Sequence, residues 1–213
     1  MEPATSRSPL PRRAGPRPRT HQGMPHTQVG VAPVAEVNAE LFRRAFRLPG
    51  VQNRPTVISV PGARGLWLDE TVTHVRPGVI LAGREFSHIH PDGSMHLTLP
   101  PDRAHEAIEA GWAEPHPIAR QMGREDTVLV YTPRTFEELE VLWSLVLDAY
   151  CHVTDRPRPK PRSRVLIARR EGDPLLGRDR QLGAHPELRG VGDLRVRLAK
   201  RSQGHVELVR DRP

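Results

Sequence analysis

The sequence predicts an α+β fold, in which a small antiparallel sheet with a central histidine-bearing hairpin is covered on one face by two or three helices. Helical and strand-like apolar patterns are mixed along the chain, as is typical of this class. The clearest strand pair flanks the turn Pro91-Asp92-Gly93 and is therefore antiparallel. The residues Thr135-Phe-Glu-Glu138 form a capping box that opens a strongly apolar helix pattern.

Three stretches of different composition predict one domain between two tails. Residues 1–34 are rich in proline and arginine without periodicity, and they predict a disordered leader. Residues 35–155 carry the periodic patterns and form the expected domain. Residues 156–213 open with alternating arginine and proline, and they predict a basic, mostly disordered extension, although 194–199 and 206–209 alternate like short strands.

Charge follows the same division. The net charge of +7 is the sum of +4 for the leader, −6 for the domain and +9 for the extension, so the basic character belongs to the ends. A specific nucleic-acid-binding domain is therefore not expected. No apolar run is long enough to span a bilayer, so we expect no membrane partner and a cytoplasmic location. Cys151 is the one cysteine, and its place at the end of an apolar helix pattern predicts a buried structural thiol.

The first elements of the domain are a helix and short strands. A helix is expected from Ala35 to Phe46, ending before Leu48-Pro49-Gly50. Strands are expected at Thr56–Val60 and Gly65–Leu68, separated by Pro61-Gly62, and a further strand at Val79–Leu81.

The next element is the histidine hairpin. Proline, aspartate and glycine at 91–93 suit a type I turn followed by a left-handed glycine bulge, which pairs His88 with His96. A two-residue Asp92-Gly93 loop would instead pair His88 with Leu97 and turn His96 to the opposite face. The bulged form is favoured because proline suits the first turn corner.

The favoured register gives the hairpin one apolar face and one face that carries the histidines. The apolar face carries Ile89, Met95, Leu97 and Leu99. The other face carries Phe86, His88, His90, His96 and Thr98. In a sheet with one side on the core, the histidines would therefore face a cavity or solvent.

The remaining elements follow the hairpin in order. Asp102 is expected to cap a helix that ends at Gly111, and Trp112 to pack back on its last turn. Thr127–Tyr131 is a strand of the buried type, and the capping box then starts the last helix.

Three converging neutral imidazoles, His88, His90 and His96, are a familiar set of ligands for zinc, iron or copper. The alternative is that these histidines are merely solvated or hydrogen-bonded. Glu85 lies on the opposite face from His88 in a regular strand, which makes it a structural or supporting residue rather than a direct ligand. His116 lies between two prolines in a loop, where site residues are common.

The motifs together resemble a known family. They are Arg84-Glu85-x-x-His88-x-His90, His96-Leu97, Gly111-Trp112-x-x-x-His116-Pro117 and Tyr131-x-Pro133-Arg134 followed by an acidic helix. In order and approximate spacing they are similar to the domain of fungal luciferases and their bacterial relatives, over about residues 80–155. The hairpin turn is shorter here than in the fungal pattern, and we expect no N-terminal membrane segment like the fungal one.

The resemblance implies a cofactor-independent oxygenase that adds O2 to a small enolic or aromatic metabolite. It implies a pocket lined by His88, His90, His96 and His116. It also implies supporting roles for Glu85, Phe86, Trp112, Tyr131 and Arg134. A histidine such as His88 or His90 would deprotonate an enol, and Arg134 would stabilise the developing anion. The alternative is a non-catalytic module that binds a ligand or transition metal on the same histidine face.

Overall fold

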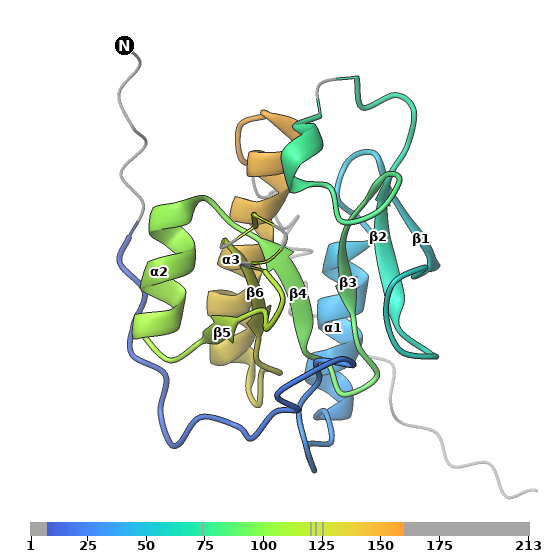
Figure 1. Ribbon diagram of the computed structural model, residues 1–213. Helices are drawn as coiled ribbons and strands as arrows, with labels where there is room; N and C mark the ends of the chain where they lie inside the picture. Colours follow the sequence, from blue (N-terminus) through green and yellow to red (C-terminus); the bar gives the residue numbers. More distant parts are fainter. Residues whose placement is uncertain (1–7, 74, 120, 122, 125, 160–213) are drawn as a thin grey trace, which may run out of the picture. The chain divides into compact units, whose positions relative to one another are not determined.

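The computed structural model describes residues 8–159 except 74, 120, 122 and 125, so the possible strands at 194–199 and 206–209 lie outside the described residues. Six strands form one antiparallel sheet in the order β1-β2-β3-β4-β6-β5 (Figure 1). The strands are β1 (Val51–Pro55), β2 (Arg64–Leu68), β3 (Glu85–Ile89), β4 (Met95–Thr98), β5 (Ala113–Pro115) and β6 (Thr127–Val130). The predicted α+β class is confirmed.

Two helices, α1 (Ala35–Ala45) and α3 (Phe136–Thr154), lie behind the sheet in Figure 1 and contact each other. A third helix, α2 (Pro101–Glu109), lies beside β5. The core between α1, α3 and the sheet includes fully buried leucines from each layer, among them Leu41, Leu97 and Leu142. The opposite face of the sheet carries the histidines of the hairpin, which are buried there.

The hairpin of β3 and β4 adopts the bulged turn. His88 pairs with His96, and the backbone N–H of His90 donates to the Ser94 carbonyl at 2.8 Å. Gly93 closes the turn with a φ of 82°, which is the left-handed conformation that the bulge requires. The two imidazoles therefore project from the same face of the sheet.

Replacing Gly93 by alanine is expected to lower the free energy of unfolding by about 1–3 kcal/mol, because an L-residue is strained at this φ. A Cβ there would also lie 3.0 Å from Asn38 Oδ1 and from Thr132 Cγ2. Denaturant unfolding measures the loss. Gly30 is a matched control with a φ of 70° and open space around its Cβ position. Equal losses at both glycines would show that crowding at Gly93 contributes nothing.

A β-bulge interrupts β3 at Phe86. Leu66 of β2 pairs with Ser87 and the next residue, Trp67, pairs with Glu85, so Phe86 is the extra residue. The bulge turns Phe86 into the core, where it is 1% exposed and lies against the ring of Tyr150. The prediction that Phe86 shares a face with His88 is wrong, because regular alternation stops at the bulge.

Other strands differ from the sequence prediction. The first strand is β1, directly before the predicted Thr56–Val60, and the β-branched residues of that stretch form the β1–β2 connection instead. Val79–Leu81 is not a strand; a 3₁₀ turn, η1 (Pro77–Val79), ends there. The short strand β5 was not expected at all. This strand forms because it pairs with β6, and no local sequence pattern predicts that pairing.

The helix ends follow local chemistry in part. The Thr135 hydroxyl accepts the Glu138 N–H at 3.2 Å, which confirms the capping box at the start of α3. In α2, Pro100 occupies the N-cap and Asp102 lies in the first turn, so Asp102 is not the predicted cap. Cys151 is half-buried near the end of α3.

The described part of the leader, residues 8–34, packs on the domain rather than remaining free. Figure 1 shows it as a dark blue segment that runs from α2 to the lower ends of β3 and β4. Arg13, His26 and Gln28 are buried, and the indole N–H of Trp112 donates to the Pro11 carbonyl at 2.6 Å. The prediction of disorder is therefore wrong for this segment, while the predicted domain boundaries stay predictions.

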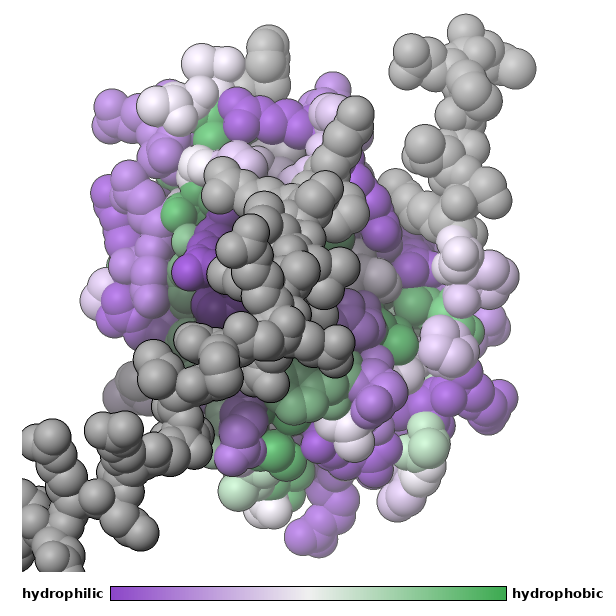
Figure 2. Space-filling model, turned by 180° about the vertical axis from the view of Figure 1, so that it is seen from behind, coloured by the Kyte–Doolittle hydropathy of each residue, from purple (hydrophilic) through white to green (hydrophobic). Residues whose placement is uncertain are grey.

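The helix side of the molecule has a mixed surface. In Figure 2 hydrophilic residues form most of the rim of this face, and apolar residues show in smaller patches between them. Among the described residues, no helix combines the length and the apolar content that crossing a membrane requires.

Candidate functional site

Five histidines lie together on the face of the sheet opposite α1 and α3. His96 of β4 is at the centre. Its ring centroid lies 5.0 Å from that of His88, 4.8 Å from His90, 4.6 Å from His116 and 5.3 Å from His26. Three of them belong to the hairpin, His116 directly follows β5, and His26 belongs to the leader. We call this group the histidine cluster.

A chain of polar contacts runs through the cluster between two carboxylates. Glu85 Oε1 lies 2.9 Å from His88 Nδ1, and His88 Nε2 lies 3.0 Å from His96 Nδ1. His96 Nε2 is 3.2 Å from His26 Nδ1, and His26 Nε2 is 2.7 Å from Glu114 Oε1. Carboxylates accept only, so each of the outer imidazoles donates one N–H outward.

Glu85 reaches His88 because of the bulge in β3. Its carboxylate is fully buried, and it also accepts from the Thr56 hydroxyl at 2.7 Å and from the Val57 N–H at 3.2 Å. In a regular strand this side chain would lie on the core face. The bulge thus places a carboxylate behind His88, where it orients the imidazole.

His90 has a different partner. Its Nδ1 lies 2.8 Å from the Ser94 hydroxyl, which lies 2.6 Å from Asp92 Oδ1. Its Nε2 is buried and has no hydrogen-bond partner among the described residues. Buried polar atoms without a partner are uncommon in proteins, so this atom is a candidate for a ligand contact.

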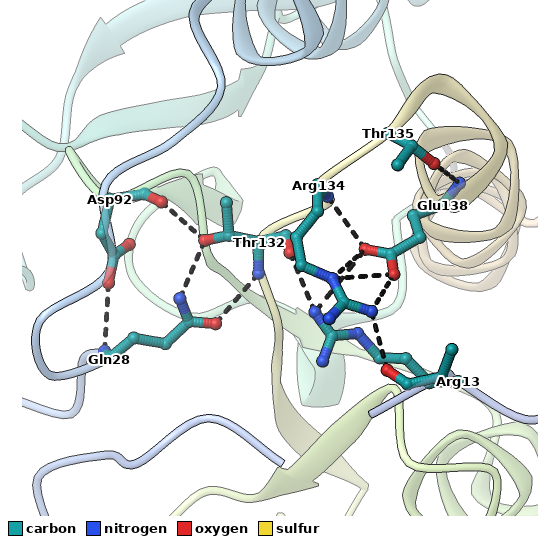
Figure 3. Close-up of polar contacts among 8 residues, drawn as sticks. Arg13, Gln28, Asp92, Thr132, Arg134, Thr135 and Glu138 are labelled. Carbon is teal, nitrogen blue, oxygen red and sulfur yellow. Dashed lines mark hydrogen bonds and ion pairs between the residues drawn. The ribbon is translucent and has the colours of Figure 1, made fainter. Parts of the chain in front are cut away.

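A second polar group holds the leader in place and with it His26 (Figure 3). The Gln28 side-chain amide donates to the Thr132 hydroxyl and accepts from the Thr132 backbone N–H, both at 3.0 Å. The backbone N–H of Gln28 donates to Asp92 Oδ2 at 3.0 Å. Arg13 adds a 3.3 Å hydrogen bond to the Thr132 carbonyl. His26, two residues before Gln28, is therefore fixed from outside the sheet.

Burial keeps much of the cluster neutral. Burial, together with the neighbouring histidines, lowers the pKa of His90 to about 3 and the pKa of His116 to about 4. The same causes hold the pKa of His96 well below its usual value. Burial alone would raise the pKa of Glu114, but hydrogen bonds from His26, Thr20 and Tyr131 outweigh it and lower that pKa. Neutral imidazoles with free lone pairs can accept protons or bind metals.

A cavity of about 590 Å³ opens beside the cluster. His26, His88, His96 and His116 form part of its wall. The rest is mainly apolar, with Met24, Pro25, Val60, Leu81 and Ile118 among the lining residues. Arg124 also lines it and has a buried Nη1 without a hydrogen-bond partner among the described residues. A mostly apolar cavity of this size with a few polar groups is typical of a small-molecule site.

Comparison with known proteins assigns the central part of the chain. Residues 83–149, from just before β3 to near the end of α3, match the family model described as the Luciferase domain. The chain contains a luciferase-like domain. No curated protein and no solved structure matches it. The matched segment of the luciferase-like domain includes four of the five clustered histidines and leaves out His26.

The structure brings some of the residues named from the sequence together and separates others. His88, His96 and His116 line the cavity of the luciferase-like domain, whereas His90 lies behind them and does not. Phe86 is in the core. Arg134 is 46% exposed and pairs with Glu138 at the start of α3 (Figure 3), away from the cavity.

The other two aromatic residues predicted to support the site are Tyr131 and Trp112. Tyr131 donates its hydroxyl to Glu114 Oε2 at 2.9 Å, so it touches the histidine cluster through that carboxylate. Trp112 is buried against the leader, near Arg13. Neither aromatic ring lines the cavity.

Sequence reasoning missed three residues of the site: His26, Glu114 and Arg124. His26 stands in a proline-rich stretch that gives no structural signal, and it reaches the cluster only through long-range contacts. Glu114 alternates with the buried Ala113 in a strand too short to recognise. Arg124 lies in the loop before β6, and only the fold brings it to the cavity.

Two overlapping groups of histidines have the spacing of a metal site. In each group one ring nitrogen per residue lies within 4.8 Å of the others. One is the predicted group His88, His90 and His96. The other is His26, His96 and His116. His96 belongs to both.

Proposed function

We propose that this luciferase-like domain protein is an oxygenase that adds O2 to a small enolic or aromatic metabolite. The observation that carries the proposal is the cavity of about 590 Å³ with imidazoles on one side and apolar residues on the other. The apolar wall suits a flat hydrophobic ring, and the imidazoles are bases beside it. Its partners would be that small molecule and O2.

The reaction needs a base, and His88 and His116 are the candidates. His116 is neutral at pH 7, since its pKa is lowered to about 4, and Glu85 orients His88. The imidazole takes the enol proton, and the resulting carbanion-like carbon gives two electrons to O2 as a C–O bond forms. The peroxide oxygen then recovers the proton from the imidazolium, and the product is a hydroperoxide. In this simplest form the reaction uses no cofactor.

The developing anion needs a positive neighbour. In this proposal Arg124 stabilises the anion, which is the role that the sequence suggested for Arg134. Arg124 lines the cavity, and its buried Nη1 has no hydrogen-bond partner within the described part of the chain. A buried guanidinium stabilises an enolate or peroxide more strongly than one in bulk water does.

Oxygen consumption with hydroxylated pyrones and phenols tests the proposal. The wild-type protein should consume O2, and His116→Ala and His88→Ala should each lower the rate by about 10²–10⁴-fold, which is the usual contribution of a positioned base. His105→Ala, a change in an exposed helical histidine, should have no effect. Unchanged consumption in both cavity variants would contradict the proposal.

A second candidate is a non-catalytic module that binds a ligand or metal on the same histidines. The unpartnered Nε2 of His90 favours it, since this atom does not reach the cavity wall and cannot serve as the base. Such a protein would bind its ligand without consuming O2.

A further inference from the structure

The histidine cluster contains more inward-facing lone pairs than protons, and the hydrogen bonds around it show which nitrogens are bare. Glu85 accepts the proton of His88 Nδ1, because a carboxylate cannot donate. Ser94 donates its hydroxyl to Asp92 and therefore accepts the proton of His90 Nδ1. In their neutral forms His88 and His90 thus both present a bare Nε2.

The same reasoning fixes His26, and it leaves neutral His96 with one proton for two bare neighbours. Glu114 accepts the proton of His26 Nε2, so His26 Nδ1 is bare. His96 Nε2 lies 3.2 Å from that bare nitrogen, and His96 Nδ1 lies 3.0 Å from the bare Nε2 of His88. Neutral His96 can donate to only one of these two neighbours, so in one of the two contacts two lone pairs face each other.

Two lone pairs that face each other at this distance repel each other unless a positive species lies beside them. A proton between His88 and His96 would satisfy that contact, but it would leave the buried Nε2 of His90 without a partner. One metal ion satisfies all three nitrogens. Ligand nitrogens about 2.0–2.1 Å from a tetrahedral ion lie roughly 3.3 Å apart, which is near the distance between His88 and His96.

We propose that His88 Nε2, His90 Nε2 and His96 Nδ1 bind one divalent transition-metal ion. The ring nitrogen of each ligand that faces away from the ion is hydrogen-bonded to an acceptor, as is usual for metal-binding histidines. His26 is then a positioning residue. Its Nδ1 accepts from His96 Nε2, and its Nε2 donates to Glu114. Imidazole ligands favour ions such as Zn²⁺, Co²⁺, Fe²⁺ or Cu²⁺.

The other group of histidines is less suited to this role. His116 Nδ1 accepts the Ile118 N–H at 3.4 Å, which leaves the proton of neutral His116 on Nε2. That tautomer offers no free lone pair to an ion shared with His26 and His96. His116 is also the one member of the five that is only half-buried.

Three protein ligands leave a coordination position open, as in catalytic metal sites. His88 and His96 line the cavity, so this position would face a bound small molecule. With His88 as a ligand, His116 is the remaining base candidate on the cavity wall, and it would accept a proton on Nδ1 once its long contact with the Ile118 N–H is broken. The metal site itself does not depend on the oxygenase proposal, because it rests on the hydrogen bonds alone.

The test is a titration of the full chain, prepared without a histidine tag and stripped with a chelator, with Co²⁺ alone. Calorimetry and the visible absorption of Co²⁺ should both give one equivalent. His90→Gln should weaken binding at least 100-fold. His26→Gln should retain one equivalent with a loss of about 10–100-fold, as is usual for residues that orient a ligand. His116→Gln and the control His105→Gln should bind like the wild type.

Several results would overturn the assignment. Less than a tenth of an equivalent on the wild-type protein would exclude the site. Wild-type binding by His90→Gln together with lost binding by His116→Gln would assign the ion to the other group. If His90→Gln does not fold by circular dichroism, Glu85→Gln takes its place, and an unchanged affinity there would count against the proposal. None of these readouts uses oxygen consumption, so the two proposals fail separately.

Discussion

Replacing Phe86 by alanine is expected to lower the free energy of unfolding by about 3–5 kcal/mol, the range found for aromatic residues removed from a packed core. The Phe86 side chain is 1% exposed, and its ring lies 6.3 Å from the ring of Tyr150 in α3. Urea unfolding followed by circular dichroism measures the change. A loss of this size is a large part of the total stability of a domain.

Phe136 is a matched control, since it is also a phenylalanine but is 50% exposed at the start of α3. Phe136→Ala should change the free energy of unfolding by less than about 0.5 kcal/mol. If the two variants lost similar amounts, Phe86 would not be a core residue, and the bulge in β3 would be placed wrongly.

The bulge that buries Phe86 also explains why the site was only partly predictable. The turn chemistry of Pro91-Asp92-Gly93 correctly predicted that His88 faces His96, because the signals for a turn lie within a few residues. A bulge is decided by the partner strand, here between Leu66 and Trp67. The sequence therefore placed Glu85 on the wrong face, and the contact with His88 came from the fold.

Elements with strong local signals were predicted well. Helix α3 has a capping box and a long apolar pattern, and the structure confirms it from Phe136 to Thr154. The strand Thr127–Val130 follows from its run of buried residue types. The strand β1, by contrast, has the polar sequence Val-Gln-Asn-Arg-Pro and reads as a loop until its pairing with β2 is known.

The leader shows the limit of composition as a guide. Proline and arginine usually mark unfolded chain because they contribute little apolar surface. Here buried polar contacts hold the segment, through Arg13 and Gln28, to a loop more than 100 residues away in sequence. His26 could not be named as a site residue without that distant partner.

The final prediction concerns Arg103 of α2, whose guanidinium is buried beside the fully buried carboxylate of Asp148 in α3. Arg103 Nε lies 2.9 Å from Asp148 Oδ2. Arg103→Met is expected to lower the free energy of unfolding by about 3–5 kcal/mol, because it removes the buried partner of a buried charge. Denaturant unfolding at neutral pH measures the loss.

Arg158 provides the control, because it contacts the other oxygen of Asp148 but is 41% exposed. Arg158→Met should cost less than about 1 kcal/mol, as exposed ion pairs usually do. The double variant Arg103→Met/Asp148→Leu should be more stable than Arg103→Met alone, since it removes the buried carboxylate together with its buried guanidinium partner. A double variant that is less stable than the single one would mean that Asp148 stabilises the fold through contacts other than Arg103. Equal losses for the two arginines would mean that burial of the Arg103 pair does not determine its contribution.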